Sequence, residues 1–140
     1  MADSLGTIPG LKLHHVALVV ADLNAAADRQ RVLGFPAGDR FMGPEQGVEV
    51  VTFSVGEGYL ELISPTDPAG AIAKFMAKRG EGFHHIAYRV DDLRATLASL
   101  QDRGVRLIDS VPRIGAHGWQ VAFIHPESCG GVLTELVQVS

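Results

Sequence analysis

Cysteine is nearly missing from this sequence, since Cys129 is the only one among its 140 residues. A single cysteine excludes a disulfide framework and a zinc site made of several thiolates. No apolar run approaches the roughly 20 residues that a membrane-spanning helix needs, so we expect no membrane association. Basic charge is also scarce: 12 lysines and arginines stand against 16 acidic residues, and the formal net charge of −4 argues against a nucleic-acid partner.

The remaining composition is that of one globular domain. Hydrophobic residues make up 46% of the chain and charged residues 20%, which is too apolar for a disordered chain. A chain of this length is of ordinary single-domain size and buries a core without disulfides. The first twelve residues contain an acid, no arginine and no long apolar stretch, unlike secretory or mitochondrial targeting segments. We therefore expect one domain over residues 1–140, located in the cytoplasm.

An internal repeat divides the chain into two halves. Residues 13–23 align with residues 83–93 at an offset of 70 residues, and six of the eleven positions are identical, including a His-His pair. A second match aligns residues 59–63 with residues 133–137 at an offset of 74 residues. The two matches together predict two copies of one supersecondary unit.

Each copy has the pattern of a strand, a helix and further strands. The strand with the histidine pair is apolar and β-branched, and Asp22 or Asp92 follows it as a candidate helix N-cap. The two helices are expected to end at Gly34 and Gly104. Later strands are expected at residues 48–55 and 59–64 in the first copy, and at residues 105–109, 120–125 and 132–138 in the second.

A linker helix is expected between the two copies, with Asp67 as its cap, Pro68 at its first position and Gly80 at its end. The predicted boundaries are module one at about residues 11–66, the linker helix at 67–80 and module two at about 81–140. This order predicts an α+β fold, in which two tandem βαβββ modules form a cupped mixed sheet with the helices outside.

Side-chain alternation along a strand decides which residues share a face. After each histidine pair, the even-numbered positions are large and apolar and should pack beneath a helix, whereas the odd-numbered face that begins with His15 or His85 is smaller and more polar. By the same alternation, Glu61 and Glu135 occupy equivalent points of their own strands. We therefore predict that His15, Glu61, His85 and Glu135 all face inward.

A carboxylate in the middle of an apolar strand needs a partner, because an unpaired buried charge costs several kcal/mol. Pseudo-twofold symmetry between the copies would bring two imidazoles and two carboxylates together. Such a set suits Co²⁺, Mn²⁺, Ni²⁺, Fe²⁺ or Zn²⁺ and leaves one or two positions open for water or substrate. The other members of the pairs, His14 and His84, are predicted to be structural or helix-facing.

Several further segments match one known family: residues 13–17, 44–48, 60–65, 72–75, 79–87, 104–109, 125–126 and 130–136. Through them the chain resembles the methylmalonyl-CoA epimerase family, within the vicinal oxygen chelate superfamily that includes glyoxalase I. The resemblance covers about residues 13–139. Its segments at 79–87 and 125–136 are fairly specific for the epimerase branch, whereas the His and Glu positions indicate the superfamily.

The resemblance implies an isomerase that interconverts (2R)- and (2S)-methylmalonyl-CoA. Its metal positions fall on His15, Glu61, His85 and Glu135, with Co²⁺ as the expected ion. The metal would act as a Lewis acid on the thioester and stabilise the enolate formed when the C2 proton leaves. Proton return on the opposite face requires a second proton carrier. The resemblance further implies an acyl-CoA substrate and a homodimer.

The sequence departs from some relatives at the second acid. Relatives with a Gln-Gly-Val-x-Glu pattern have a glutamate where this chain has Val50, and Glu49 lies one residue earlier. A two-residue hairpin turn at positions 56–57 would place Thr52 opposite Glu61, with Val50 inward and Glu49 outward. Glu135 is therefore the expected base, and Glu49 is a secondary catalytic candidate. An aromatic pair of the relatives is also replaced at residues 28–30, which leaves the acyl group open.

Two other functions stay open at this stage. A glyoxalase I-like lactoylglutathione lyase also moves a proton beside a metal, and turnover of the methylglyoxal–glutathione hemithioacetal would favour it. A non-catalytic ligand-binding member of the superfamily would bind a drug tightly without metal. A dioxygenase fits less well, because the second carboxylate takes a position that a two-His-one-carboxylate iron site leaves open.

Overall fold

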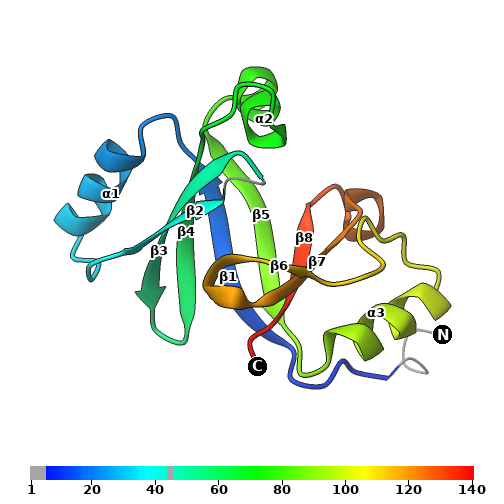
Figure 1. The fold of residues 1–140 in the computed structure, drawn as a ribbon. Coiled ribbons are helices and arrows are strands. Elements are labelled where there is room, and N and C mark those ends of the chain that lie inside the picture. The colour runs from blue at the N-terminus through cyan, green and yellow to red at the C-terminus, as the bar shows by residue number, and fades with distance from the viewer. Residues whose placement is uncertain (1–5, 44–45) are drawn as a thin grey trace. The chain divides into compact units, whose positions relative to one another are not determined.

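The computed structural model describes residues 6–43 and 46–140. In chain order the elements are β1 (Lys12–Val19), α1 (Leu23–Val32), β2 (Asp39–Gly43), β3 (Val48–Val55), β4 (Gly58–Pro65), α2 (Ala71–Arg79), β5 (Gly82–Arg89), α3 (Leu93–Asp102), β6 (Arg113–Ile114), β7 (Gln120–Ile124) and β8 (Thr134–Gln138) (Figure 1). Within these two described ranges, no helix is both long and apolar enough to cross a membrane. Pro44 and Glu45, part of one family-matching segment, lie outside the described residues.

The chain forms two compact units, residues His15–His85 and residues Ile86–Ser140 together with the segment that precedes residue 15. The strand order is β2-β3-β4-β1 in the first module and β5-β8-β7-β6 in the second. The β1–β4 and β5–β8 pairs are parallel, and the other pairs within each module are antiparallel. The α+β class and the repeated βαβββ order are therefore confirmed.

The strand register shows the repeat at the level of single residues. Ala17 in β1 pairs with Glu61 in β4, and Ala87 in β5 pairs with Glu135 in β8. Each of these alanines follows the second histidine of its pair by two residues. The two sequence offsets of the repeat are thus the offsets between structurally equivalent strands.

The helices of both modules begin where the sequence predicts. The side chains of Asp22 and Asp92 each accept a hydrogen bond of 3.0 Å from the amide three residues ahead. Each aspartate thereby satisfies an amide of the first turn that has no partner within the helix. Gly34 and Gly104 follow the helices with φ angles of 95° and 82°, the left-handed conformation that commonly ends a helix.

Side-chain alternation divides the first module into two faces. One face packs with α1 in a buried cluster of Val20, Leu23, Ala26, Val51, Phe53 and Leu62, and α1 lies against β3 and β4 (Figure 1). The other face buries Ala17, Val48, Val50 and Ile63, with Phe41 and Ile72 packed against them. Leu18 and Val20 lie on the helix side and Ala17 on the other, which confirms the predicted parity of β1.

The second module has the same two-faced construction. Its helix face buries Val90, Leu93, Leu97, Ala122, Ile124 and Leu136. Cys129 is partly buried and packs against this cluster. The opposite face buries Ala87, Val121 and Val137, with Trp119 packed against them. Ala87 is thus the counterpart of Ala17 in packing as well as in register.

The linker helix begins later than predicted. α2 starts at Ala71, because the preceding residues form a turn in which the Gly70 amide donates to the Asp67 carbonyl at 3.0 Å. The Asp67 side chain accepts from the amide two residues ahead at 2.9 Å, so it stabilises this turn and not the first turn of a helix. Pro68 therefore occupies a turn position, and its expected place at the first helical position is wrong.

The strand expected at residues 105–109 does not form. Leu107 makes one isolated bridge to Ile124, and the amides of Ile108 and Asp109 both donate to the carbonyl of Phe123. On the side of β7 away from β8, the pairing strand is instead the short β6, at Arg113–Ile114. In the first module, β2 is an edge strand that the hydrophobic pattern did not place, since Phe41 is its only side chain packed against the core clusters.

Candidate metal centre

His15 lies in β1 on the face shared with Ala17, and only 3% of the residue is exposed. Its register partner in β4 is Tyr59, two residues before Glu61. The parallel register therefore places the imidazole one step along the strand from the carboxylate. The distance from His15 Nε2 to Glu61 Oε2 is 3.7 Å.

Glu61 is the central residue of a row that crosses three strands. Thr52 in β3 and Ala17 in β1 are its register partners, and the glutamate is 9% exposed. The hairpin register confirms the turn at positions 56–57 and the predicted pairing of Glu61 with Thr52. A carboxylate in such a position is stabilised only by a nearby positive group or by hydrogen bonds.

His85 lies in β5 and is 2% exposed. Its Nε2 atom is 3.0 Å from Nε2 of His15, and the two rings meet edge to face with centroids 5.2 Å apart. One ligand atom from each of His15, Glu61 and His85 lies within 4.8 Å of the other two. Three of the four predicted ligands therefore converge within one compact unit.

The geometry of the two imidazoles fits a transition-metal ion. Nitrogens that share an ion at about 2.0–2.1 Å each lie roughly 2.9–3.4 Å apart, for bond angles between octahedral and tetrahedral. The 3.0 Å separation of the His15 and His85 Nε2 atoms falls in this range. Imidazole nitrogen with carboxylate oxygen is a donor set used by Zn²⁺, Co²⁺, Fe²⁺ and Ni²⁺. His15, Glu61 and His85 thus form a candidate metal site.

Glu135, the fourth predicted ligand, lies in β8 of the second module. It is 7% exposed and pairs with Ala87 on one side and Phe123 on the other. This position is the equivalent of Glu61, which pairs with Ala17 and Thr52. Glu135 therefore shares the strand position and burial of Glu61, and its role as a ligand stays a prediction.

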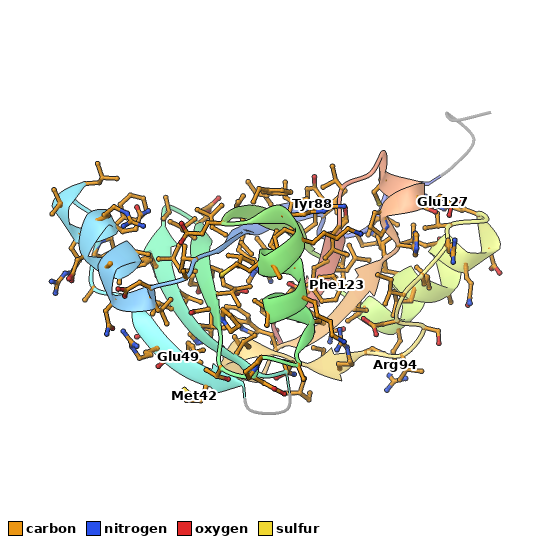
Figure 2. The ribbon with its side chains drawn as sticks, turned by 90° about the horizontal axis from the view of Figure 1, so that it is seen from above. Met42, Glu49, Tyr88, Arg94, Phe123 and Glu127 are labelled. Atoms are coloured by element: carbon orange, nitrogen blue, oxygen red, sulfur yellow. The ribbon has the colours of Figure 1, made fainter. Side chains whose placement is uncertain are left out.

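Glu49 lies in β3, on the face of the sheet opposite to the one that carries Glu61 of β4. It is the register partner of Met42, and both residues are labelled in Figure 2. Its carboxylate pairs with the Arg40 guanidinium at 3.0 Å, and Arg40 also donates to Asn24 of α1. Val50, the next residue, is buried on the other face. The expectation that Val50 faces inward and Glu49 outward is confirmed, and a catalytic role of Glu49 stays a prediction.

The other histidine of each pair contacts an aromatic ring. His14 meets Trp119 edge to face with ring centroids 4.5 Å apart. His84 meets Phe75 of α2 in the same way at 4.8 Å, so it is helix-facing as predicted. His84 also bonds to His85 through their Nδ1 atoms at 2.8 Å. The sequence did not indicate this bond, because simple alternation points neighbouring side chains to opposite faces.

The comparison with known proteins agrees with this fold. A family model described as the glyoxalase/bleomycin resistance protein/dioxygenase superfamily matches residues 14–123. The chain therefore belongs to this superfamily.

Within the superfamily, several of its relatives are named as epimerases of acyl-CoA thioesters. The chain is 40% identical over 129 residues to a protein of Bos taurus named "Methylmalonyl-CoA epimerase, mitochondrial", covering 91% of this chain and 74% of the relative. It is 40% identical over 131 residues to "Ethylmalonyl-CoA/methylmalonyl-CoA epimerase" of Cereibacter sphaeroides, covering 91% and 98%. A solved structure of methylmalonyl-CoA epimerase with methylmalonyl-CoA and NH₄⁺ is 35% identical, with a TM-score of 0.89 and 96% of each chain covered. The predicted resemblance to an epimerase-type isomerase is confirmed.

Proposed function

We propose that this chain is a metal-dependent epimerase that interconverts (2R)- and (2S)-methylmalonyl-CoA. The observation that carries the proposal is the convergence of His15, Glu61 and His85 in a chain whose relatives are named for this reaction. A lactoylglutathione lyase or a ligand-binding module would belong to the same superfamily, but the relatives described above are named as epimerases.

The proposed ligands of the cation are His15, Glu61 and His85, with Glu135 as the fourth. Glu135 is included because its strand register and burial match those of Glu61. Co²⁺ is the proposed ion, and Mn²⁺, Ni²⁺, Zn²⁺ and Fe²⁺ suit the same donors. When bound, the cation supplies a Lewis acid for the thioester oxygen and the neighbouring carboxylate.

The protein's own contribution is to move the C2 proton. We propose Glu135 as the base, because a carboxylate at a buried position accepts a proton without water competing for it. Loss of the C2 proton leaves a planar carbon, and inversion requires that a proton return from the opposite side. A second carrier is therefore part of the reaction. Glu49 is the secondary candidate from sequence, but its outward position and its ion pair with Arg40 argue against this role, so the second carrier stays unassigned.

The acyl group has a second candidate. The bacterial relative that this chain covers almost completely is named for ethylmalonyl-CoA as well as methylmalonyl-CoA. Epimerisation of the two thioesters differs only in the alkyl group on C2. We propose methylmalonyl-CoA as the main substrate and ethylmalonyl-CoA as the second to be assayed. A homodimer and a cytoplasmic location complete the proposal.

The test is isotope exchange at C2. Purified protein supplied with Co²⁺ is mixed with (2R)-methylmalonyl-CoA in D₂O, and mass spectrometry should show one deuterium gained by the acyl group. Parallel samples contain ethylmalonyl-CoA or the methylglyoxal–glutathione hemithioacetal. Turnover of the hemithioacetal without exchange in either thioester would contradict the proposal and favour the lyase. Exchange in ethylmalonyl-CoA alone would support the proposed epimerisation but show that the substrate is ethylmalonyl-CoA.

A further inference from the structure

The His84 ring packs against Phe75 of α2, which is itself covered by Arg79. Its edge meets the ring of Phe75 at a centroid distance of 4.8 Å and an interplanar angle of 77°. The guanidinium of Arg79 lies 5.8 Å from the centroid of the same Phe75 ring. Phe75 and Arg79 are four residues apart in α2, so they share one side of this helix. α2 therefore supplies a packed support against which the His84 imidazole rests.

The two nitrogens of the His85 ring have different partners. Nδ1 lies 2.8 Å from Nδ1 of His84, and Nε2 lies 3.0 Å from Nε2 of His15. The first contact is a hydrogen bond within the pair, and the second belongs to the candidate metal centre. A neutral His85 ring carries one hydrogen, which lies either on Nδ1, facing His84, or on Nε2, facing the candidate metal centre.

The position of that hydrogen decides whether His85 can bind a cation. A neutral imidazole has one N–H and one lone pair, and a metal binds only through the lone pair. Binding through Nε2 requires the hydrogen of His85 on Nδ1, where the partner is Nδ1 of His84. His84 must then accept this hydrogen bond and carry its own hydrogen on Nε2. The reverse arrangement would put a hydrogen on His85 Nε2 and block the ligand.

We propose that His84 is a positioning residue that fixes His85 as the Nδ1–H tautomer and directs its Nε2 lone pair toward the cation. The inference rests on the proposed function only in taking His85 as a ligand. Groups that accept the second N–H of a metal-binding histidine typically change metal affinity by about 10- to 100-fold when removed. The support of His84 by α2 holds the acceptor in place.

The chain allows a matched pair of variants. In His84→Asn, the side-chain Oδ1 is attached at the same distance from Cβ as the Nδ1 of histidine, so an acceptor remains for His85. In His84→Leu, the volume is largely kept and the acceptor is lost. His125→Leu makes the same change at a histidine whose Nδ1 accepts a hydrogen bond from Glu127 in the second module, and serves as the control.

The test has two readouts, neither of which is activity. Long-range ¹H–¹⁵N NMR of the metal-free wild type should show His85 as the Nδ1–H tautomer. Calorimetric titration with Co²⁺ should show affinity about 10- to 100-fold weaker for His84→Leu, a loss of less than about 10-fold for His84→Asn, and no change for His125→Leu. The NMR result and the Asn variant carry the test even if the Leu variant does not fold.

Three results would overturn the proposal: an Nε2–H tautomer of His85 in the wild type, wild-type Co²⁺ affinity in His84→Leu, or an equal loss in the Asn and Leu variants. The last result would show that the ring of His84 acts by packing alone. Failure of the proposed function can be told apart from failure of this proposal. Deuterium exchange tests only the function, whereas the His85 tautomer and the Co²⁺ affinities are measured without substrate.

Discussion

Glu61 combines a charged side chain with a buried position in the middle of β4. Its neighbours across the sheet are Thr52 and Ala17, neither of which carries a charge. A buried carboxylate is costly in a module that gains most of its stability from apolar packing. The proposed cation between Glu61 and the two histidines would offset this cost, which gives the buried carboxylate a functional explanation.

Substitutions at Glu61 separate these two contributions. In Glu61→Leu the metal-free protein should lose no more than about 1 kcal/mol of unfolding free energy, because the lost contact with His15 is offset by removing the desolvation cost of a buried carboxylate. Co²⁺ should then bind more weakly than to the wild type, and Glu61→Gln, which keeps an oxygen donor, should lie between the two. Chemical denaturation and calorimetry measure both quantities. Wild-type Co²⁺ affinity in the Leu variant would exclude Glu61 as a ligand.

The two candidate proton carriers are tested by the same isosteric change. Glu135→Gln should slow deuterium exchange at C2 by about 10²- to 10⁴-fold, the usual contribution of a general base. Glu49→Gln should leave exchange close to wild type, because the Glu49 carboxylate pairs with Arg40 on the opposite face of β3 from Glu61. A hundredfold loss in the Glu49 variant would instead make this residue the second carrier.

Elements with strong local signals were predicted well from the sequence. The caps at Asp22 and Asp92 and the hairpin at positions 56–57 depend on residues close together in the chain, and all three form. Side-chain alternation also predicted the inward face of His15, Glu61 and His85, and the ligand atoms of these three residues lie close together.

Elements that depend on distant partners were predicted less well. β2 is an exposed edge strand whose pairing with β3 is visible only in three dimensions. β6 has two residues, too few for a periodic pattern. The hydrogen bond between His84 and His85 could not be predicted from side-chain alternation, because alternation places neighbouring side chains of β5 on opposite faces. Tertiary contacts thus settle what local pattern leaves open.

The N-cap of α3 provides a prediction about stability alone. Asp92→Ala should lower the free energy of unfolding by about 0.5–2 kcal/mol, because it removes the acceptor of a first-turn amide. Asp102→Ala, at the other end of the same helix, should be neutral or slightly stabilising, since an acid is unfavourable near a helix C-terminus. Urea denaturation measures both. Equal destabilisation by the two changes would show that the cap bond contributes little.

At the scale of the whole molecule, two equivalent modules each provide a histidine strand and a glutamate strand in the same register. A ligand that binds only the folded chain stabilises it by about 2.7 kcal/mol at a concentration 100 times its dissociation constant. Co²⁺ should therefore raise the thermal midpoint of the wild type. It should not raise that of His15→Ala, while His125→Ala should respond like the wild type. An equal rise in all three proteins would place the bound ion elsewhere.

The most direct test of the account compares one protein in two states of metal loading. Deuterium incorporation at C2 of (2R)-methylmalonyl-CoA is measured for chelator-treated protein and for the same sample after addition of Co²⁺, with His85→Ala in parallel. We expect no exchange in the treated wild type, exchange after Co²⁺ is added, and none in the variant under either condition. Undiminished exchange by the metal-free protein, or by His85→Ala, would contradict the assignment of this cluster as the centre of the reaction.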